Sequence, residues 1–309
     1  MQSKELIRAT HARSPKAKWE QRVADLSALA KAARTAAVSL LTVGLMVFQP
    51  AAANATPEEI VALAVYEKDK TLYRATPKTL ASSSNGGKTW DPIKAPALDK
   101  GGAIAAFAVS AQNKDVFYLA APGGGVMRST DGGRNWSKQV KGLPKQSVSL
   151  LTTHSSQAET VYAYIPGDGI YRSQDRGASW RKTDSGPRQA LRSFVHTDMP
   201  GSMETGWLFA ASADGVRRSM DCFCGWHKAG ELSGEMTAIT YDPDEPMRVY
   251  SAGKPGLFVS EDGGETWTGM KAPAAKVSAL LAVPGNALYL ASEGVLYRSS
   301  DRGKTWEKA

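Results

Sequence analysis

The side chains with the most varied chemistry gather in one short segment, residues 220–227, which reads Met-Asp-Cys-Phe-Cys-Gly-Trp-His. Cys222, Cys224 and His227 could bind zinc or copper through soft sulfur and nitrogen donors. Their spacing matches neither the Cys-x2-Cys pattern of zinc sites nor the Cys-x2-Cys-His pattern of haem attachment. Two free thiols, or a strained and reducible disulfide across one residue, are the alternatives. We therefore predict no bound metal or cofactor, and these residues remain the metal-site candidate.

Two acidic residues, Asp168 and Asp214, suggest a different chemistry. Inverting glycosidases need only two carboxyl groups about 6.5 to 9.5 Å apart, one as acid and one as base. Gly-Asp-Gly at 167–169 and Ala-Asp-Gly at 213–215 are also ordinary turn sequences, in which the carboxylate bonds to nearby backbone amides. The turn interpretation is favoured, and no residue is predicted to be catalytic.

The elements that must position these residues follow from an eight-residue pattern, Ser-x-Asp-x-Gly-x-x-Trp, that recurs through residues 56–309. The pattern is complete at Ser129, Ser173, Ser260 and Ser299. The first copy, at Ser83, has Asn in place of Asp, and the fourth, at Ser219, has Phe in place of Gly. The six serines are 46, 44, 46, 41 and 39 residues apart. Such regular spacing indicates one structural unit repeated six times.

Each unit contains three short apolar segments before the octet, and its Trp opens a fourth. Units of about 40 to 45 residues with four short strands are typical of propeller blades. We predict an all-β protein, a six-bladed β-propeller of four-stranded antiparallel blades. The predicted blades span approximately residues 60–97, 102–141, 147–184, 190–229, 236–272 and 277–309 of a propeller domain at 56–309.

The octet residues have a mechanical explanation that needs no catalysis. The Asp accepts backbone N–H bonds across a tight turn, the Gly supplies a positive φ, and the Trp fills space between neighbouring sheets. The residues with this structural role are Asn85, Asp131, Asp175, Asp221, Asp262 and Asp301, with Trp90, Trp136, Trp180, Trp226, Trp267 and Trp306.

These octets resemble the Asp-box, or bacterial neuraminidase repeat. It occurs in sialidases, sortilin ectodomains, xyloglucan-active hydrolases and the photosystem II stability and assembly factor family. The resemblance covers residues 60–309 and implies a propeller with the box at the blade periphery, on the face away from the ligand site. It does not decide function, because the superfamily mixes enzymes with binding modules. A sialidase-like enzyme would be expected to carry an Arg-Ile-Pro type motif before the first box, where this chain has Arg74-Ala75-Thr76.

If the box joins the third and fourth strands of a blade, the opposite face carries the turns between the second and third strands and the crossovers between blades. A ligand or partner is expected on that face. Its candidate residues are Lys141, Lys145, Asp168, Arg188, Arg192, Asp214, Lys254, Lys271 and Glu293.

Residues 1–55 have the pattern of a targeting segment. The apolar run at 36–48 is too short to cross a bilayer as a helix, which needs about 20 residues. Ala53-Asn54-Ala55 provides a small-x-small site for signal peptidase, so cleavage after Ala55 is expected, behind an unusually long n-region. An uncleaved short anchor is the alternative. Both place the body outside the cytoplasm, periplasmic or secreted, and membrane contact is expected only through an uncleaved leader.

The distribution of charge along the chain argues against a nucleic-acid-binding function. The net charge is +8, but residues 1–55 hold 8 basic against 3 acidic residues and residues 56–309 hold 30 against 27. Polyanion binding needs cations concentrated on one surface of the folded body, so no nucleic-acid partner is predicted. The body is instead dipolar: residues 101–146 carry 6 basic and 2 acidic side chains, and residues 231–269 carry 2 and 8. This asymmetry favours docking on a complementary protein.

The predicted function is therefore a non-enzymatic, extracytoplasmic propeller that binds a protein partner in the envelope, as an assembly or maturation factor of a larger complex. The alternative is an exo-acting, sialidase-like glycoside hydrolase or a carbohydrate-binding propeller. A deep pocket with paired carboxyls and converging arginines would favour the enzyme, and a shallow charged rim would favour the binding module.

Overall fold

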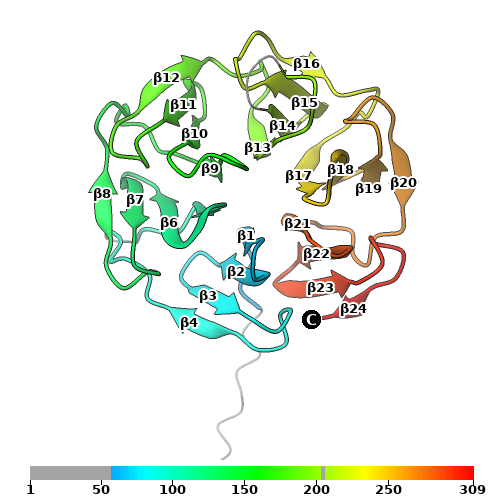
Figure 1. The fold of residues 1–309 in the computed structure, drawn as a ribbon, viewed down its shortest axis with the longest axis horizontal. Helices are drawn as coiled ribbons and strands as arrows, with labels where there is room; N and C mark the ends of the chain where they lie inside the picture. The colour runs from blue at the N-terminus through cyan, green and yellow to red at the C-terminus, as the bar shows by residue number, and fades with distance from the viewer. Residues whose placement is uncertain (1–56, 100, 203–205) are drawn as a thin grey trace, which may run out of the picture. The chain divides into compact units, whose positions relative to one another are not determined.

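A computed structural model describes residues 57–99, 101–202 and 206–309. The predicted signal segment and its cleavage site lie outside these described residues. Within them the secondary structure consists of 24 β-strands, and no helix is long and apolar enough to span a membrane. The strands form six four-stranded sheets arranged as blades of one ring (Figure 1). The predicted six-bladed propeller fold is confirmed.

Every blade is one continuous stretch of chain whose four antiparallel strands pair in sequence order. The strands of the first three blades are β1 (Ala62–Tyr66), β2 (Thr71–Ala75), β3 (Leu80–Ser83), β4 (Asp91–Ile93), β5 (Ala106–Ser110), β6 (Asn113–Ala121), β7 (Gly125–Ser129), β8 (Ser137–Gln139), β9 (Leu150–Thr153), β10 (Val161–Ile165), β11 (Gly169–Ser173) and β12 (Arg181–Asp184). Those of the last three are β13 (Leu191–Thr197), β14 (Trp207–Ser212), β15 (Gly215–Met220), β16 (His227–Lys228), β17 (Met236–Asp242), β18 (Glu245–Gly253), β19 (Gly256–Ser260), β20 (Thr268–Met270), β21 (Ala279–Val283), β22 (Ala287–Ser292), β23 (Val295–Ser299) and β24 (Glu307–Lys308).

Burial along the strands follows their place in the blade. A second strand such as β10 is buried at every residue, because neighbouring blades cover both faces of the sheet, and it is accordingly apolar. A fourth strand such as β8 lies at the rim of the ring and is mostly exposed and polar. The first strands surround the central axis in Figure 1.

The core lies between blades. Between the first and second blades, the Phe117 ring packs edge-on against Tyr73 at 5.3 Å and against Phe107 at 5.5 Å, and Trp136 lies 6.2 Å from Phe117. Such aromatic pairs add stability beyond the area they bury. The hydrophobic core is therefore a ring of inter-blade clusters, which holds the loops of all six blades in fixed positions.

The ring closes without strand exchange, because β1–β4 and β21–β24 form separate sheets. The seam between the sixth and first blades is joined by side chains: the Ser278 hydroxyl donates to the Ile60 carbonyl at 2.9 Å, and the Tyr289 hydroxyl donates to the Gly86 carbonyl at 3.1 Å. Ile60, Leu72, Tyr289 and Leu296 form a shared apolar cluster there.

Candidate functional site

The antiparallel order of each blade divides its loops between two faces of the ring. One face, here called the box face, carries the first-to-second strand turns and the boxes. The other, here called the loop face, carries the second-to-third strand turns and the crossovers between blades. The strand order places the nine candidate residues in loop-face turns and crossovers, except Arg192, which lies in β13.

Most of the acidic candidates on the loop face are already neutralised. Asp168 accepts a hydrogen bond from Lys182 at 2.7 Å, which is the main reason that its pKa is lowered, and a second from Tyr171. Asp214 pairs with Arg217 at 2.5 Å within the same turn. Both aspartates therefore lie in loop-face turns and are paired with neighbouring side chains, so neither is a free carboxylate.

Two further carboxylates of the same face form ion pairs that link successive blades or fasten a loop. Glu235 lies 2.6 Å from Lys254 and 3.4 Å from Arg192, and these cations lower its pKa. Glu293 pairs with Lys276 at 2.8 Å. The crossover between β16 and β17, which contains Glu235, is thus held by charge as well as by packing.

Four cations of the loop face have no ion-pair partner among the described residues. They are exposed side chains in crossovers between blades: Lys141, Lys145, Arg188 and Lys271. Backbone atoms hold two of these crossovers in place, because the Lys141 carbonyl accepts the Trp180 backbone N–H at 2.9 Å and the Lys271 carbonyl accepts the Trp306 indole at 3.2 Å. The result is a set of free positive charges on a fixed backbone, which is suited to a negatively charged ligand.

The central channel is a cavity of about 200 Å³ lined by the first strands of all six blades. Its wall is largely aliphatic, with Arg192 among the few charged residues. Glu67 and Tyr241 also line it, and the Tyr241 hydroxyl donates to Glu67 at 3.4 Å. Burial, followed by the charge of Asp198, raises the pKa of Glu67. The channel is therefore narrow and apolar, with an acidic group at the end formed by the β1–β2 turn.

Five of the six boxes share one geometry. In the second, the Ser129 hydroxyl donates to Asp131 at 2.8 Å, Asp131 accepts the backbone N–H of Asn135 at 2.9 Å, and Gly133 has a φ of 86°. The carboxylate is stabilised by these donors: the Thr305 hydroxyl and backbone N–H lower the pKa of Asp301 to about 2. The box is a turn that closes on itself, as the sequence predicts.

The boxes also connect blades. The indole N–H of Trp267 donates to the Ala229 carbonyl of the preceding blade at 2.8 Å, and Trp136 makes the equivalent bond to Lys94 at 2.9 Å. In the other direction, Arg128 and Arg218 donate to carbonyls in the box of the following blade, at 2.8 and 2.6 Å. The arginines that precede the box serines therefore bind the ring together.

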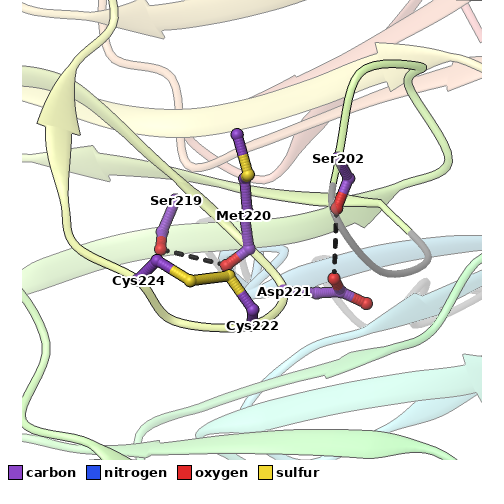
Figure 2. Close-up of a disulfide and its surroundings, with 6 residues drawn as sticks. All are labelled: Ser202, Ser219, Met220, Asp221, Cys222 and Cys224. Carbon is purple, nitrogen blue, oxygen red and sulfur yellow. Dashed lines mark hydrogen bonds between the residues drawn. A yellow bond between two sulfur atoms is a disulfide. The ribbon is translucent and has the colours of Figure 1, made fainter.

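The fourth box departs from this geometry (Figure 2). Cys222 and Cys224 form a disulfide with a Cα–Cα separation of 5.5 Å, so no thiolate pair is present for a metal. The Ser219 hydroxyl donates to the Met220 carbonyl at 3.0 Å instead of to the box aspartate. Phe223, at the usual glycine position, has a φ of 56°, a left-handed conformation that is costly for a bulky residue. His227 lies apart in β16, with its Nε2 3.6 Å from where a Cβ of Gly225 would be.

Asp221 points away from the disulfide and accepts a hydrogen bond from the Ser202 hydroxyl at 3.3 Å (Figure 2). Its carboxylate also faces two histidines. The Nε2 atoms of His154, which follows β9, and of His196, in β13, both lie 3.8 Å from its carboxylate, and the two rings stack at 3.7 Å. All three side chains are buried. Burial, and then the neighbouring His196, lower the pKa of His154 to about 3. The cluster therefore joins the third and fourth blades through two stacked imidazoles and one carboxylate.

This His–Asp–His cluster has the ligand types of a metal site, but its hydrogen bonds do not fit one. His154 Nδ1 accepts the backbone N–H of Ser156 and of Gln157, each at 3.1 Å, and His196 Nδ1 accepts that of Ser155 at 3.2 Å. With Nδ1 as acceptor, the proton of a neutral ring is on Nε2, which then has no lone pair for a metal. Stacked rings also place a shared ion out of both ring planes. We conclude that the cluster is a structural clamp.

His154 and His196 are not among the candidate residues of the sequence, because they lie far from Asp221 along the chain. The sequence feature that could have pointed to this cluster is the altered fourth octet, in which the aspartate does not close the turn.

Comparison with known proteins agrees with this geometry. Residues 53–200, just under half of the chain, match the family described as photosynthesis system II assembly factor YCF48, and residues 296–309 match the BNR-Asp box repeat. The chain belongs to the Asp-box β-propeller superfamily. No curated protein matches the sequence of this Asp-box propeller.

Several solved structures share the fold of this Asp-box propeller. The structure titled "YCF48 bound to D1 peptide" is 20% identical with a TM-score of 0.54, and the match covers 82% of both chains. The GH74 enzyme of Niastella koreensis is 16% identical (TM-score 0.58), and the GH74 xyloglucanase of Xanthomonas campestris is 19% identical (0.56); each match covers 80% of this chain. The Asp-box propeller spans only 46% and 45% of those two enzymes. At these identities the likeness shows the fold alone.

Proposed function

We propose that this Asp-box propeller is a non-enzymatic binding module that docks a protein partner on its loop face, as an assembly or maturation factor does. The observation that supports this most directly is the family match, because residues 53–200 resemble an assembly factor family. One protein of that family has been solved as "YCF48 bound to D1 peptide".

The charges of the loop face support the same proposal. Lys141 and Lys145 are in the crossover from the second to the third blade, and Arg188 is in the next one. Because these cations have no ion-pair partner among the described residues, they can bind carboxylates of a partner without first breaking an internal pair. Charges of this kind steer a complementary surface into place. We propose a partner segment that is acidic where it meets these two crossovers.

A glycoside hydrolase is the weaker alternative. GH74 enzymes share the fold, but the carboxyl pair that the sequence offers, Asp168 and Asp214, is held by Lys182 and Arg217. An inverting mechanism needs one of its carboxyls protonated at working pH, and the pKa of both aspartates is lowered, that of Asp168 chiefly by Lys182. Asp168 and Asp214 are therefore suited to stabilising their turns and not to acid–base catalysis.

We further propose that the propeller works outside the cytoplasm. The support is the amino-terminal sequence alone, with its apolar run and the Ala53-Asn54-Ala55 site. Intact mass measurement of the protein isolated from its native cells tests this: a mature form starting at Thr56 supports export, and a full-length form confined to the cytoplasm contradicts it.

The partner proposal is tested by quantitative cross-linking of the full chain in native extracts, followed by mass spectrometry. The test variant is Lys141→Glu with Lys145→Glu on the loop face. The matched control is Lys88→Glu with Lys304→Glu, which makes the same charge change at exposed positions of two boxes. We expect one protein, cross-linked in stoichiometric amount, to be lost with the loop-face variant and kept with the control. Equal cross-linking with both variants would exclude the loop face as the docking site.

A further inference from the structure

The disulfide of the fourth box has no role in the proposed docking on the loop face. The chain has two cysteines, and both are in this one turn on the box face. The other five boxes close the same turn with an aspartate or asparagine that accepts the backbone N–H four residues on. Here Asp221 contacts the two histidines, and the turn instead contains a disulfide between the residues on either side of Phe223.

This bond is poorly placed to stabilise the fold. A disulfide acts mainly by restricting the unfolded chain, and the restriction grows with the length of the loop that it closes. Cys222 and Cys224 have one residue between them, so the loop is among the shortest possible. The neighbouring strands β15 and β16 are already paired, and Trp226 is fastened to the preceding blade by its bond to Asp184 at 2.8 Å. The turn is therefore held at both ends without the disulfide.

The bond is well placed for exchange. Cys224 is exposed and Cys222 is half-buried, so an incoming thiolate can reach one sulfur more readily than the other.

We propose that Cys222–Cys224 is a reversible redox site whose substrate is a dithiol, supplied by a protein or small molecule that meets the box face. A thiolate of the substrate attacks Sγ of Cys224, the S–S bond breaks, and its electron pair leaves on Sγ of Cys222, which takes a proton from solvent. The second substrate thiolate then attacks the mixed disulfide and releases Cys224. The propeller gains two electrons and two protons as thiols, and the substrate leaves as a disulfide.

The first test is an equilibrium titration of the full chain in mixtures of reduced and oxidised glutathione. Thiols are trapped by alkylation and counted by intact mass, and dithiothreitol serves as the dithiol probe. We expect half-reduction within the range that glutathione mixtures cover, with a melting temperature that stays close to that of the oxidised form. A bond that stays closed in a large excess of reduced glutathione, or a protein that unfolds when it opens, would overturn the proposal, because either result marks a structural disulfide.

The second test asks which sulfur is attacked. Cys222→Ser keeps the exposed thiol, and Cys224→Ser keeps the half-buried one. With oxidised glutathione we expect Cys222→Ser to form the mixed disulfide at least ~10-fold faster, because access to the sulfur governs the rate. Equal rates, or the opposite order, would overturn the assignment of Cys224.

Neither test involves partner capture on the loop face, so the redox proposal and the docking proposal can fail independently.

Discussion

The box tryptophans allow the inter-blade packing to be tested quantitatively. Trp180 is 5% exposed and its indole N–H has no hydrogen-bond partner among the described residues, whereas Trp267 is half-buried and donates to Ala229 at 2.8 Å. Trp180→Ala should lower the free energy of unfolding by about 3 to 5 kcal/mol, because the ring leaves a cavity between blades. Trp267→Ala should cost somewhat less in packing, but it also leaves the Ala229 carbonyl without its donor, which adds about 1 kcal/mol.

Phenylalanine variants separate the two contributions. Trp180→Phe removes ring volume and an indole N–H that has no partner among the described residues, while Trp267→Phe removes ring volume and a hydrogen bond. Trp267→Phe should therefore carry an additional cost of about 1 kcal/mol that Trp180→Phe does not. Urea unfolding followed by circular dichroism measures all four variants, and a thermal shift of about 2 to 4 °C per kcal/mol is expected for a domain of this size. An unchanged stability of Trp180→Ala would refute the view that the boxes hold the blades together.

Four further predictions concern the boxes and the clamp. The pKa of His154 is lowered to about 3 in the folded protein, so between about pH 6.5 and about pH 3 the unfolded chain binds a proton that the folded chain does not. The free energy of unfolding should therefore decrease as the pH falls through this window. His154→Gln should make the urea midpoint less dependent on pH there. Gly264→Ala should cost at least about 1 to 2 kcal/mol, because its φ is 87° and a Cβ would lie 3.0 Å from Ala229, as thermal melting can show. Phe223→Gly should instead change the melting temperature little, since relief of the positive φ offsets the loss of its contact with Tyr162, and a large loss of stability would contradict this account. Asp301→Ala should destabilise the wild-type protein more at pH 6 than at pH 2, because a carboxylate with a pKa of about 2 stabilises the turn only while it is charged.

The fold could be predicted because propeller blades are local structures. Each blade is built from about 40 consecutive residues, and its box closes through bonds within the octet, such as Ser129 to Asp131. Glycines at positions such as 133 and 264 report a positive φ directly, since other residues avoid it. Six copies of one such unit leave few ways to bury their apolar faces other than against one another.

The sites could be predicted only in part. The strand order was enough to place Asp168, Lys141 and their companions on one face of the ring. It could not show that Lys182 neutralises Asp168 while Lys141 remains unpaired, because that depends on side-chain reach of a few ångströms across a turn.

The amino-acid sequence by itself determined the repeat, the blade number and the role of each complete box, because those depend on contacts between residues close together in the chain. Only the tertiary structure decided how the fourth box departs from the other five and which residues its aspartate contacts. His154 and His196 come from different blades, and nothing in their local sequence indicates that both rings point at Asp221. Their stacking exists because the inter-blade core holds two neighbouring blades at a fixed distance. Both rings and the carboxylate are buried in that core, so they contact one another instead of water.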